Sequence, residues 1–425
     1  MKSLLDKVNA KLNAQGGFFK AVSVLVGGTA FAQVIGLICL PILTRIYTPE
    51  DYSILGVYIA IVSIFSVISC LRFEIAIPIA KSDFSAKKLL ILSIYTNFLI
   101  SILLFITITL LHSYLVEFAF LAKLENTIYL IPLGVLVAGM YSAFQFWSIR
   151  KNNYSDIARS RMMQAISGNS SSILIGYTYQ SFLGLMIGQI FNLGGGILKL
   201  SLKALQDFKE LPKVKRHVLF KTFVEYKNYP KYSTLEALLN TAALQLPIII
   251  IGFFLIGPAV GFLYLAMRIL GIPMSLIGSS MGQVYVAQGS KIYERKGDLY
   301  NFTIRILKKL FKITLIPFLL LAILSPFLFG FILGEDWGQI GWYISLMVPW
   351  YFMHILTSPL SMSLHIVGKQ KVALILQGFN LFLRVIVLIL VCILNKEIAV
   401  FYYLLSGFLF YCIYLFVIVK KVRGD

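Results

Sequence analysis

Long runs of apolar residues constrain this sequence more than any other feature. A run of about 20 such residues can cross the hydrocarbon core of a bilayer as a single helix. Only 13% of the residues are charged, about half the share that is usual in soluble proteins, and these charges cluster between the apolar runs. The sequence therefore predicts an all-α polytopic membrane protein.

Twelve of the runs are candidate transmembrane helices. They cover 19–42, 52–79, 87–112, 127–149, 158–177, 181–203, 231–256, 258–289, 302–333, 338–365, 371–394 and 397–419. Lysine and arginine are concentrated in the N-terminal segment, after every even-numbered run and in the C-terminal tail, whereas the alternate loops hold only Arg45, Lys123 and Lys396. Because cytoplasmic loops are enriched in these residues, both termini are predicted to be cytoplasmic.

The longest polar stretch divides the chain into two halves of six helices each. The predicted parts are an amphipathic N-terminal segment at 1–18, an N-terminal lobe at 19–203, a cytoplasmic linker at 204–230, a C-terminal lobe at 231–419 and a cytoplasmic tail at 420–425. The second helix of each half contains a similar stretch, GVYIA at 56–60 and GFLYLA at 261–266. Two related six-helix lobes forming a pseudo-twofold V around a central cavity are a common transporter plan.

Several other functional classes lack their motifs. The net charge of +20 follows from the loop alternation, so nucleic acid is not an expected partner. There is no phosphate-binding Gly-Lys-Ser/Thr loop, no HExxH and no CxxC, which argues against an ATPase or a metal site. The GxSxG match at 278–282 lies in an apolar helix, where small residues favour close helix packing. We expect no enzyme and no cofactor.

Polar residues recur at helical spacing on five of the predicted helices. Such stripes need polar partners or water, and five of them together favour a hydrated cavity. The candidate cargo-binding residues of this cavity are Arg268, Arg384, Asn380, Gln377, Ser275, His354 and Gln33.

Arg268 and Arg384 are the charged residues placed deepest by helix arithmetic. Arg268 lies about 16 Å from the outer end of its helix, and Arg384 about 16 Å from Asn395. Both therefore fall near the middle of a hydrocarbon core about 30 Å thick, where each needs an anion. That anion is either the cargo or an intramembrane acid, for which Glu74 and Glu236 are the candidates.

The stretch CLRFEIAIP at 70–78 carries two further charges, Arg72 and Glu74. The stretch belongs to the second predicted helix, 52–79, so these residues, two apart, lie on opposite faces and cannot neutralise each other. Both residues are candidates for a cargo portal near the cytoplasmic surface or for an ion pair with other partners.

These stretches together resemble the polysaccharide (O-antigen-type) flippases of the multidrug/oligosaccharidyl-lipid/polysaccharide exporter superfamily. The resemblance rests on ILTRIYTPEDYSILGVY after the first helix, LRFEIAIPIAKSD after the second, YKNYPKYSTLEALLN before the seventh, RILGIPMSLIG in the eighth and LGEDW after the ninth. Their order within a twelve-helix frame extends over nearly the whole chain. One departure is Ser233-Thr234-Leu235-Glu236, where the family tends to have Ser-Thr-Pro and a neutral residue.

The resemblance implies two six-helix lobes that work by alternating access in a bacterial inner membrane. The implied cargo is a polyprenyl-pyrophosphate-linked oligosaccharide, moved to the outer leaflet for surface polysaccharides such as O-antigen or capsule. Membrane lipids, a polysaccharide polymerase and a chain-length regulator are the implied partners. A proton or sodium gradient is the expected energy source, with Glu236, Glu74 and His354 as candidate sites.

Two rival functions remain at this point. A cation-coupled multidrug antiporter of the same superfamily would favour acidic residues in the cavity, whereas the mid-span charges here are arginines. A membrane enzyme of polysaccharide assembly, such as a polymerase or ligase, would be expected to have a sizeable outer loop, and none is predicted.

Overall fold

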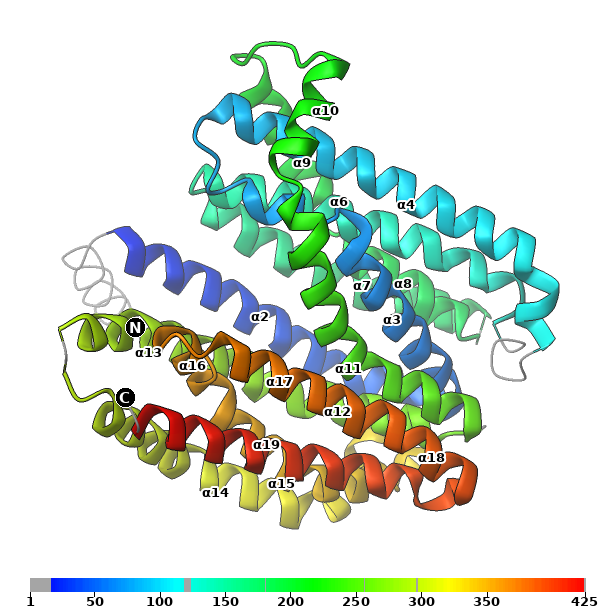
Figure 1. The fold of residues 1–425 in the computed structure, drawn as a ribbon. Helices are drawn as coiled ribbons and strands as arrows, with labels where there is room; N and C mark the ends of the chain where they lie inside the picture. Colours follow the sequence, from blue (N-terminus) through cyan, green and yellow to red (C-terminus); the bar gives the residue numbers. More distant parts are fainter. Residues whose placement is uncertain (1–16, 118–123, 180, 256, 296, 424–425) are drawn as a thin grey trace, which may run out of the picture. The chain divides into compact units, whose positions relative to one another are not determined.

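The computed structural model describes residues 17–117, 124–179, 181–255, 257–295 and 297–423. Throughout these residues the chain forms helices, mostly α-helices joined by short 3-10 and π-helical segments, and no strand (Figure 1). The amphipathic segment predicted at 1–18 lies almost wholly outside the described residues.

Within the described residues, ten helices are long and apolar enough to cross a membrane. They cover Val24–Ile46, Pro49–Ser69, Asp83–Tyr114, Thr127–Arg150, Leu183–Phe208, Tyr229–Phe254, Ala259–Gly278, Leu299–Leu333, Lys371–Leu394 and Lys396–Arg423. The fifth and tenth predicted helices correspond to α7 (Tyr154–Tyr179) and α15 (Ile340–Thr357), which are not among the ten. The all-helical, multi-pass architecture is confirmed, while the count of twelve and the side of the termini stay predictions.

The helices group into two compact units. The first comprises Met1–Leu43 and Ile61–Leu238, and the second comprises Thr44–Ala60 and Leu239–Asp425. Three helices are therefore shared between the units: α2 (Gly17–Ile46), α3 (Pro49–Ser69) and α11 (Thr234–Phe254). The beginning of α3 packs with the second half of the chain, which no hydropathy pattern indicates.

Besides its parts of α2, α3 and α11, the first unit contains the helices between α3 and α11. They are η1 (Phe73–Ala76), α4 (Asp83–Glu117), η2 (Glu125–Tyr129), α6 (Leu130–Arg150), α7, α8 (Leu183–Gly194), α9 (Ile197–Phe208), α10 (Arg216–Glu225) and η3 (Tyr229–Ser233). The predicted sixth helix is thus divided into α8 and α9. The break occurs at Gly195–Gly196, where Gly196 has a φ of 86° and a Cβ would lie 2.4 Å from Ser160 Cβ.

Most of the expected linker at 204–230 is helical and is held against the first unit. The Lys87 ammonium donates to the carbonyls of Phe208, Leu211 and Pro212, at 3.2, 3.2 and 3.1 Å. These carbonyls lie at and just after the C-terminal end of α9, where the charge of the lysine suits the negative end of the helix dipole. Farther along, Phe223 of α10 packs edge-on against Phe73.

The second unit contains the remaining helices. They are α12 (Ala259–Pro273), η4 (Met274–Gly278), α13 (Ser279–Glu294), α14 (Leu299–Leu333), η5 (Glu335–Trp337), α15, η6 (Ser358–Leu360), α16 (Ser363–Ile366), α17 (Gln370–Leu381), η7 (Phe382–Ile386), α18 (Val387–Leu394), η8 (Lys396–Ile398) and α19 (Ala399–Arg423). Among them η4 and η7 are π-helical, an uncommon conformation that often marks functional positions.

The two similar stretches noted in the sequence pack against each other. Gly56 lies against Tyr264, where a Cβ would come within 3.0 Å of the tyrosine Cβ, and a Cβ on Gly261 would lie 1.9 Å from the Pro49 carbonyl oxygen. Ser53 joins the same contact, because its hydroxyl accepts a hydrogen bond from the Gly261 amide at 2.8 Å. Small residues therefore bring α3 and α12 close together.

Candidate functional site

Arg268 lies in α12 beside two buried phenols of the second unit. Tyr264 precedes it by one helical turn, and Tyr52 comes from the beginning of α3; the charge of Arg268 acts on both phenols. The close approach of α3 and α12 at Gly56 places Tyr52 here. Arg268 itself is half-buried, whereas both phenols are buried more deeply.

Arg384 is enclosed completely, with 0% of its surface exposed. Its guanidinium carbon lies 4.3 Å from the Trp350 ring centroid and 4.4 Å from that of Tyr403. The guanidinium therefore makes a cation–π contact with each of these two rings. None of its three side-chain nitrogens makes a hydrogen bond of good geometry within the described chain. A buried cation with open donors is suited to an anion.

Neither arginine is neutralised by an acid in the part of the chain that the structure describes. All five ion pairs found there join residues of the first unit. The acids described in the second unit lie at helix ends or between helices; they are Glu50, Asp51, Glu294, Asp298, Glu335, Asp336 and Glu397. Arg268 and Arg384 therefore lie within apolar helices, and neither forms an ion pair with any of these acids.

Three other residues that the sequence predicts to bind cargo lie near Arg384 in space or in the chain. They are His354, Asn380 and Gln377. The His354 ring stacks on Tyr411 with 4.2 Å between the ring centroids, and the charge of Arg384 acts on it. Asn380 is buried in α17 and Gln377 lies one turn earlier. The side-chain oxygen of each amide accepts no hydrogen bond among the described residues. Trp350 of α15 is buried and packs against Arg384.

The remaining predicted residues lie elsewhere. Ser275 is in the π segment η4 and donates to the Ile272 carbonyl at 2.9 Å. Gln33 is half-buried in α2, within the first unit. Glu236 is exposed in the first turn of α11.

The stretch CLRFEIAIP does not continue the second helix, and the prediction that Arg72 and Glu74 cannot neutralise each other is wrong. α3 ends at Ser69, and Leu71 and Arg72 take left-handed φ angles of 49° and 60°. The prediction assumed helical geometry, in which residues two apart lie on opposite faces. The turn has a different geometry and brings Arg72 Nη1 to 3.6 Å from Glu74 Oε1. A portal role for the pair stays a prediction.

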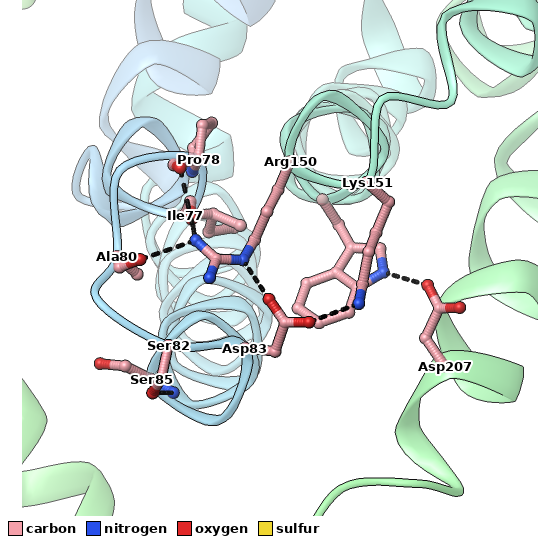
Figure 2. A network of polar contacts seen from close by, with 10 residues as sticks. Ile77, Pro78, Ala80, Ser82, Asp83, Ser85, Arg150, Lys151 and Asp207 are labelled. Carbon is pink, nitrogen blue, oxygen red and sulfur yellow. Dashed lines mark hydrogen bonds and ion pairs between the residues drawn. The ribbon is translucent and has the colours of Figure 1, made fainter.

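The end of the same turn is fastened by a polar network from α6 (Figure 2). Arg150 Nη1 donates to the carbonyls of Ile77, Pro78 and Ala80 at 3.1, 3.3 and 2.8 Å, while its Nε donates to Asp83 Oδ1 at 2.8 Å. These bonds satisfy carbonyls that no regular helix pairs. The family-like stretch LRFEIAIPIAKSD is therefore a folded turn whose shape depends on a distant arginine.

Sequence reasoning counted several basic residues only as topology signals. Arg150 is one, Lys87 is another, and Arg161 is a third, since it lies inside α7 and hydrogen-bonds the Thr29 hydroxyl of α2. Gly28 permits that contact, because a Cβ there would be 2.6 Å from Ala158 Cβ. The sequence does not reveal the hydrogen-bonding roles of these three residues, because they lie near the polar loops. No spacing distinguishes them from the other lysines and arginines there.

Comparison with known proteins bears on family and fold. A family model described as polysaccharide biosynthesis protein matches residues 42–341. No curated protein matches the chain.

Three solved structures are similar in fold. An inward-facing multidrug resistance MATE family transporter of the MOP superfamily is 12% identical, with a TM-score of 0.67 and 94% of each chain covered. The lipid II flippase MurJ in an inward closed conformation is 16% identical, with a TM-score of 0.66 over 94% of this chain and 90% of that one. A MATE transporter from Vibrio cholerae is 14% identical, with a TM-score of 0.58 over 98% of each chain. The chain therefore shares the fold of these three proteins.

Proposed function

The chain belongs to the polysaccharide biosynthesis protein family, and we propose that it is a flippase for polyprenyl-pyrophosphate-linked oligosaccharides. Family and fold together support a flippase or transporter. The proposed cargo moves from the cytoplasmic to the outer leaflet of a bacterial inner membrane, where it supplies a surface polysaccharide such as O-antigen or capsule.

The observation that carries this proposal is the pair of uncompensated arginines in the second unit. A pyrophosphate concentrates negative charge and loses its hydration when it enters a low-dielectric region, so it needs fixed positive charge there. A guanidinium offers paired donors that match phosphate oxygens. Arg268, which is half-buried, is the proposed first contact, and Arg384 adds positive charge from within the helices.

We propose that twelve helices with cytoplasmic termini form two lobes that alternate access to the two leaflets. The lipid tail would stay in the bilayer while the head group passes the arginines. Coupling to a proton or sodium gradient is proposed through Glu236, Glu74 or His354. Of these, Glu236 is exposed, whereas Glu74 is paired with Arg72 and His354 is stacked on Tyr411.

The cation-coupled antiporter remains the rival function. Such a protein would be expected to attract its cargo with carboxylates, whereas the acids described in the second unit lie at helix ends or between helices and none forms an ion pair with Arg268 or Arg384. The charge distribution therefore favours an anionic cargo.

Replacement of Arg268 by alanine tests the proposal. The gene is deleted from its host, and wild-type or variant protein is returned at matched levels in the membrane. Loss of a partner for a desolvated charge costs about 2 kcal/mol or more, so Arg268→Ala should lower surface-glycan output at least about tenfold. Arg305→Ala is the matched control, since Arg305 is an exposed arginine of α14, and it should leave the output unchanged. Normal glycan from Arg268→Ala would refute the assignment.

A further inference from the structure

The π segment η7 sets the direction in which Arg384 points. Its backbone bonds span five residues instead of four, as shown by the Val387 amide, which bonds to the Phe382 carbonyl. A π segment inserts one residue relative to an α-helix, which turns the following side chains by about 100°. Arg384 is the third of the five residues of η7, so conversion of η7 to a regular helix would turn its guanidinium by part of this angle.

Two consecutive residues of α19 contact two consecutive residues of η7. The Tyr402 hydroxyl donates to the Leu383 carbonyl at 3.0 Å, and the Tyr403 ring lies 4.4 Å from the Arg384 guanidinium carbon. One contact is made to the backbone and the other to the side chain. α19 thus engages both the irregular backbone of η7 and the charge that this backbone presents.

The second aromatic ring that contacts the guanidinium, that of Trp350, is positioned by the same helix. Trp350 of α15 packs against Gly407 of α19 so closely that a Cβ on Gly407 would lie 2.6 Å from the indole. Trp350 and Tyr403 are themselves in edge-to-face contact, with 5.2 Å between ring centroids. α19 therefore positions both rings around Arg384, and the hydroxyl of its Tyr402 bonds to the π backbone that carries Arg384.

We propose that Tyr402 is a positioning residue for Arg384. Its hydroxyl holds the carbonyl of Leu383, keeps η7 in the π conformation and so maintains the Arg384 guanidinium between Trp350 and Tyr403. The Tyr402 hydroxyl bonds to the backbone of η7, so Tyr402 acts on Arg384 through the backbone. The role of Arg384 in binding cargo rests on the proposed function. The role of Tyr402 in positioning the Arg384 side chain rests on the contacts described above and is independent of that function.

The test uses Tyr402→Phe in the full-length protein in detergent micelles or nanodiscs. The readout is the Nε–H resonance of Arg384, identified by its loss in Arg384→Lys. Ring currents from Trp350 and Tyr403 shift this resonance upfield of exposed arginines, and Tyr402→Phe should move it toward them. Tyr285→Phe is the matched control, because it removes a buried hydroxyl that bonds to Thr303 at 2.7 Å elsewhere in the second unit. The control should leave the resonance in place.

A binding measurement with geranylgeranyl pyrophosphate as the probe completes the test. Loss of one neutral hydrogen bond corresponds to about a threefold to tenfold change, so Tyr402→Phe should weaken binding by that factor. In an Arg384→Ala background the same change should have no further effect, since the residues act as one unit.

The outcomes separate the two proposals. An unmoved resonance in Tyr402→Phe, an equal movement in Tyr285→Phe, or additive losses of binding would each overturn the positioning role. If the wild type does not bind the probe while the resonance moves as expected, the flippase proposal fails and the positioning role stands.

Discussion

Replacement of Arg150 by methionine should loosen the turn between α3 and α4. The side chain has only 12% of its surface exposed and donates four hydrogen bonds, of which three share Nη1 and go to carbonyls of the turn. Methionine fills similar space but donates nothing, so buried carbonyls lose their partner. The perturbation is therefore confined to hydrogen bonding and charge.

The expected cost follows from these contacts. A hydrogen bond to a charged group contributes about 1.5 kcal/mol or more, and the three bonds that share Nη1 count as about two, which makes about 3 kcal/mol. The ion pair with Asp83 adds little, because that carboxylate has 42% of its surface exposed. Lys151→Met is the matched control: it removes a 2.6 Å ion pair to the same carboxylate and should cost about 0.5 kcal/mol.

Cys70 provides the assay, since it lies in the same turn and is 2% exposed. In a protein whose other three cysteines are replaced by alanine, the rate of maleimide labelling reports how often this turn opens. A cost of about 3 kcal/mol predicts labelling about a hundredfold faster in Arg150→Met, against about twofold in Lys151→Met. Equal rates in the two variants, or a change below about threefold in Arg150→Met, would refute the reasoning.

Two further predictions concern packing and pH. Gly407→Ala should destabilise the protein by about 1–3 kcal/mol and lower its Tm, because the new Cβ overlaps the Trp350 indole. Gly378→Ala is the control and should change the Tm little, because the space around its Cβ is open. Equal Tm values for the two variants would contradict the predicted clash. Hydrogen bonds and charge from Lys203 and a second lysine of α9 hold the pKa of Asp156 below its ordinary value. The pair therefore stabilises the fold above the ordinary carboxyl pKa of about 3.9, and this contribution disappears as the pH falls through the lowered value. Asp156→Asn should accordingly flatten the acid side of a Tm–pH profile, and an unchanged profile would exclude this role.

The turn at 70–78 illustrates where sequence reasoning stops. The apolar pattern continues through CLRFEIAIP and predicts a continuous helix. In that helix Arg72 and Glu74 would lie on opposite faces. The structure ends α3 at Ser69 and pairs the two charges. The decisive partner is Arg150, about 70 residues later, and a local pattern contains no information on a donor that arrives from another helix.

The candidate site shows the same division. Helix arithmetic alone placed Arg268 and Arg384 far from the membrane surfaces, and the structure puts both in the second unit without a carboxylate partner in its described residues. The enclosure of Arg384 by Trp350 and Tyr403 was not predictable, because it depends on a π segment and on the close approach of α15 to α19 at Gly407. The roles assigned to these residues stay predictions until they are tested by substitution.

The sequence by itself determined that this protein is helical, crosses a membrane many times and resembles polysaccharide flippases. Each of these conclusions depends on local quantities: apolar length, which must match the bilayer, and short motifs in a fixed order. Only the tertiary structure decided which charges are paired, where helices break and which rings surround Arg384. Those outcomes depend on the distance between segments that are far apart in the chain, and burial makes each unmet donor or acceptor costly enough to select one arrangement.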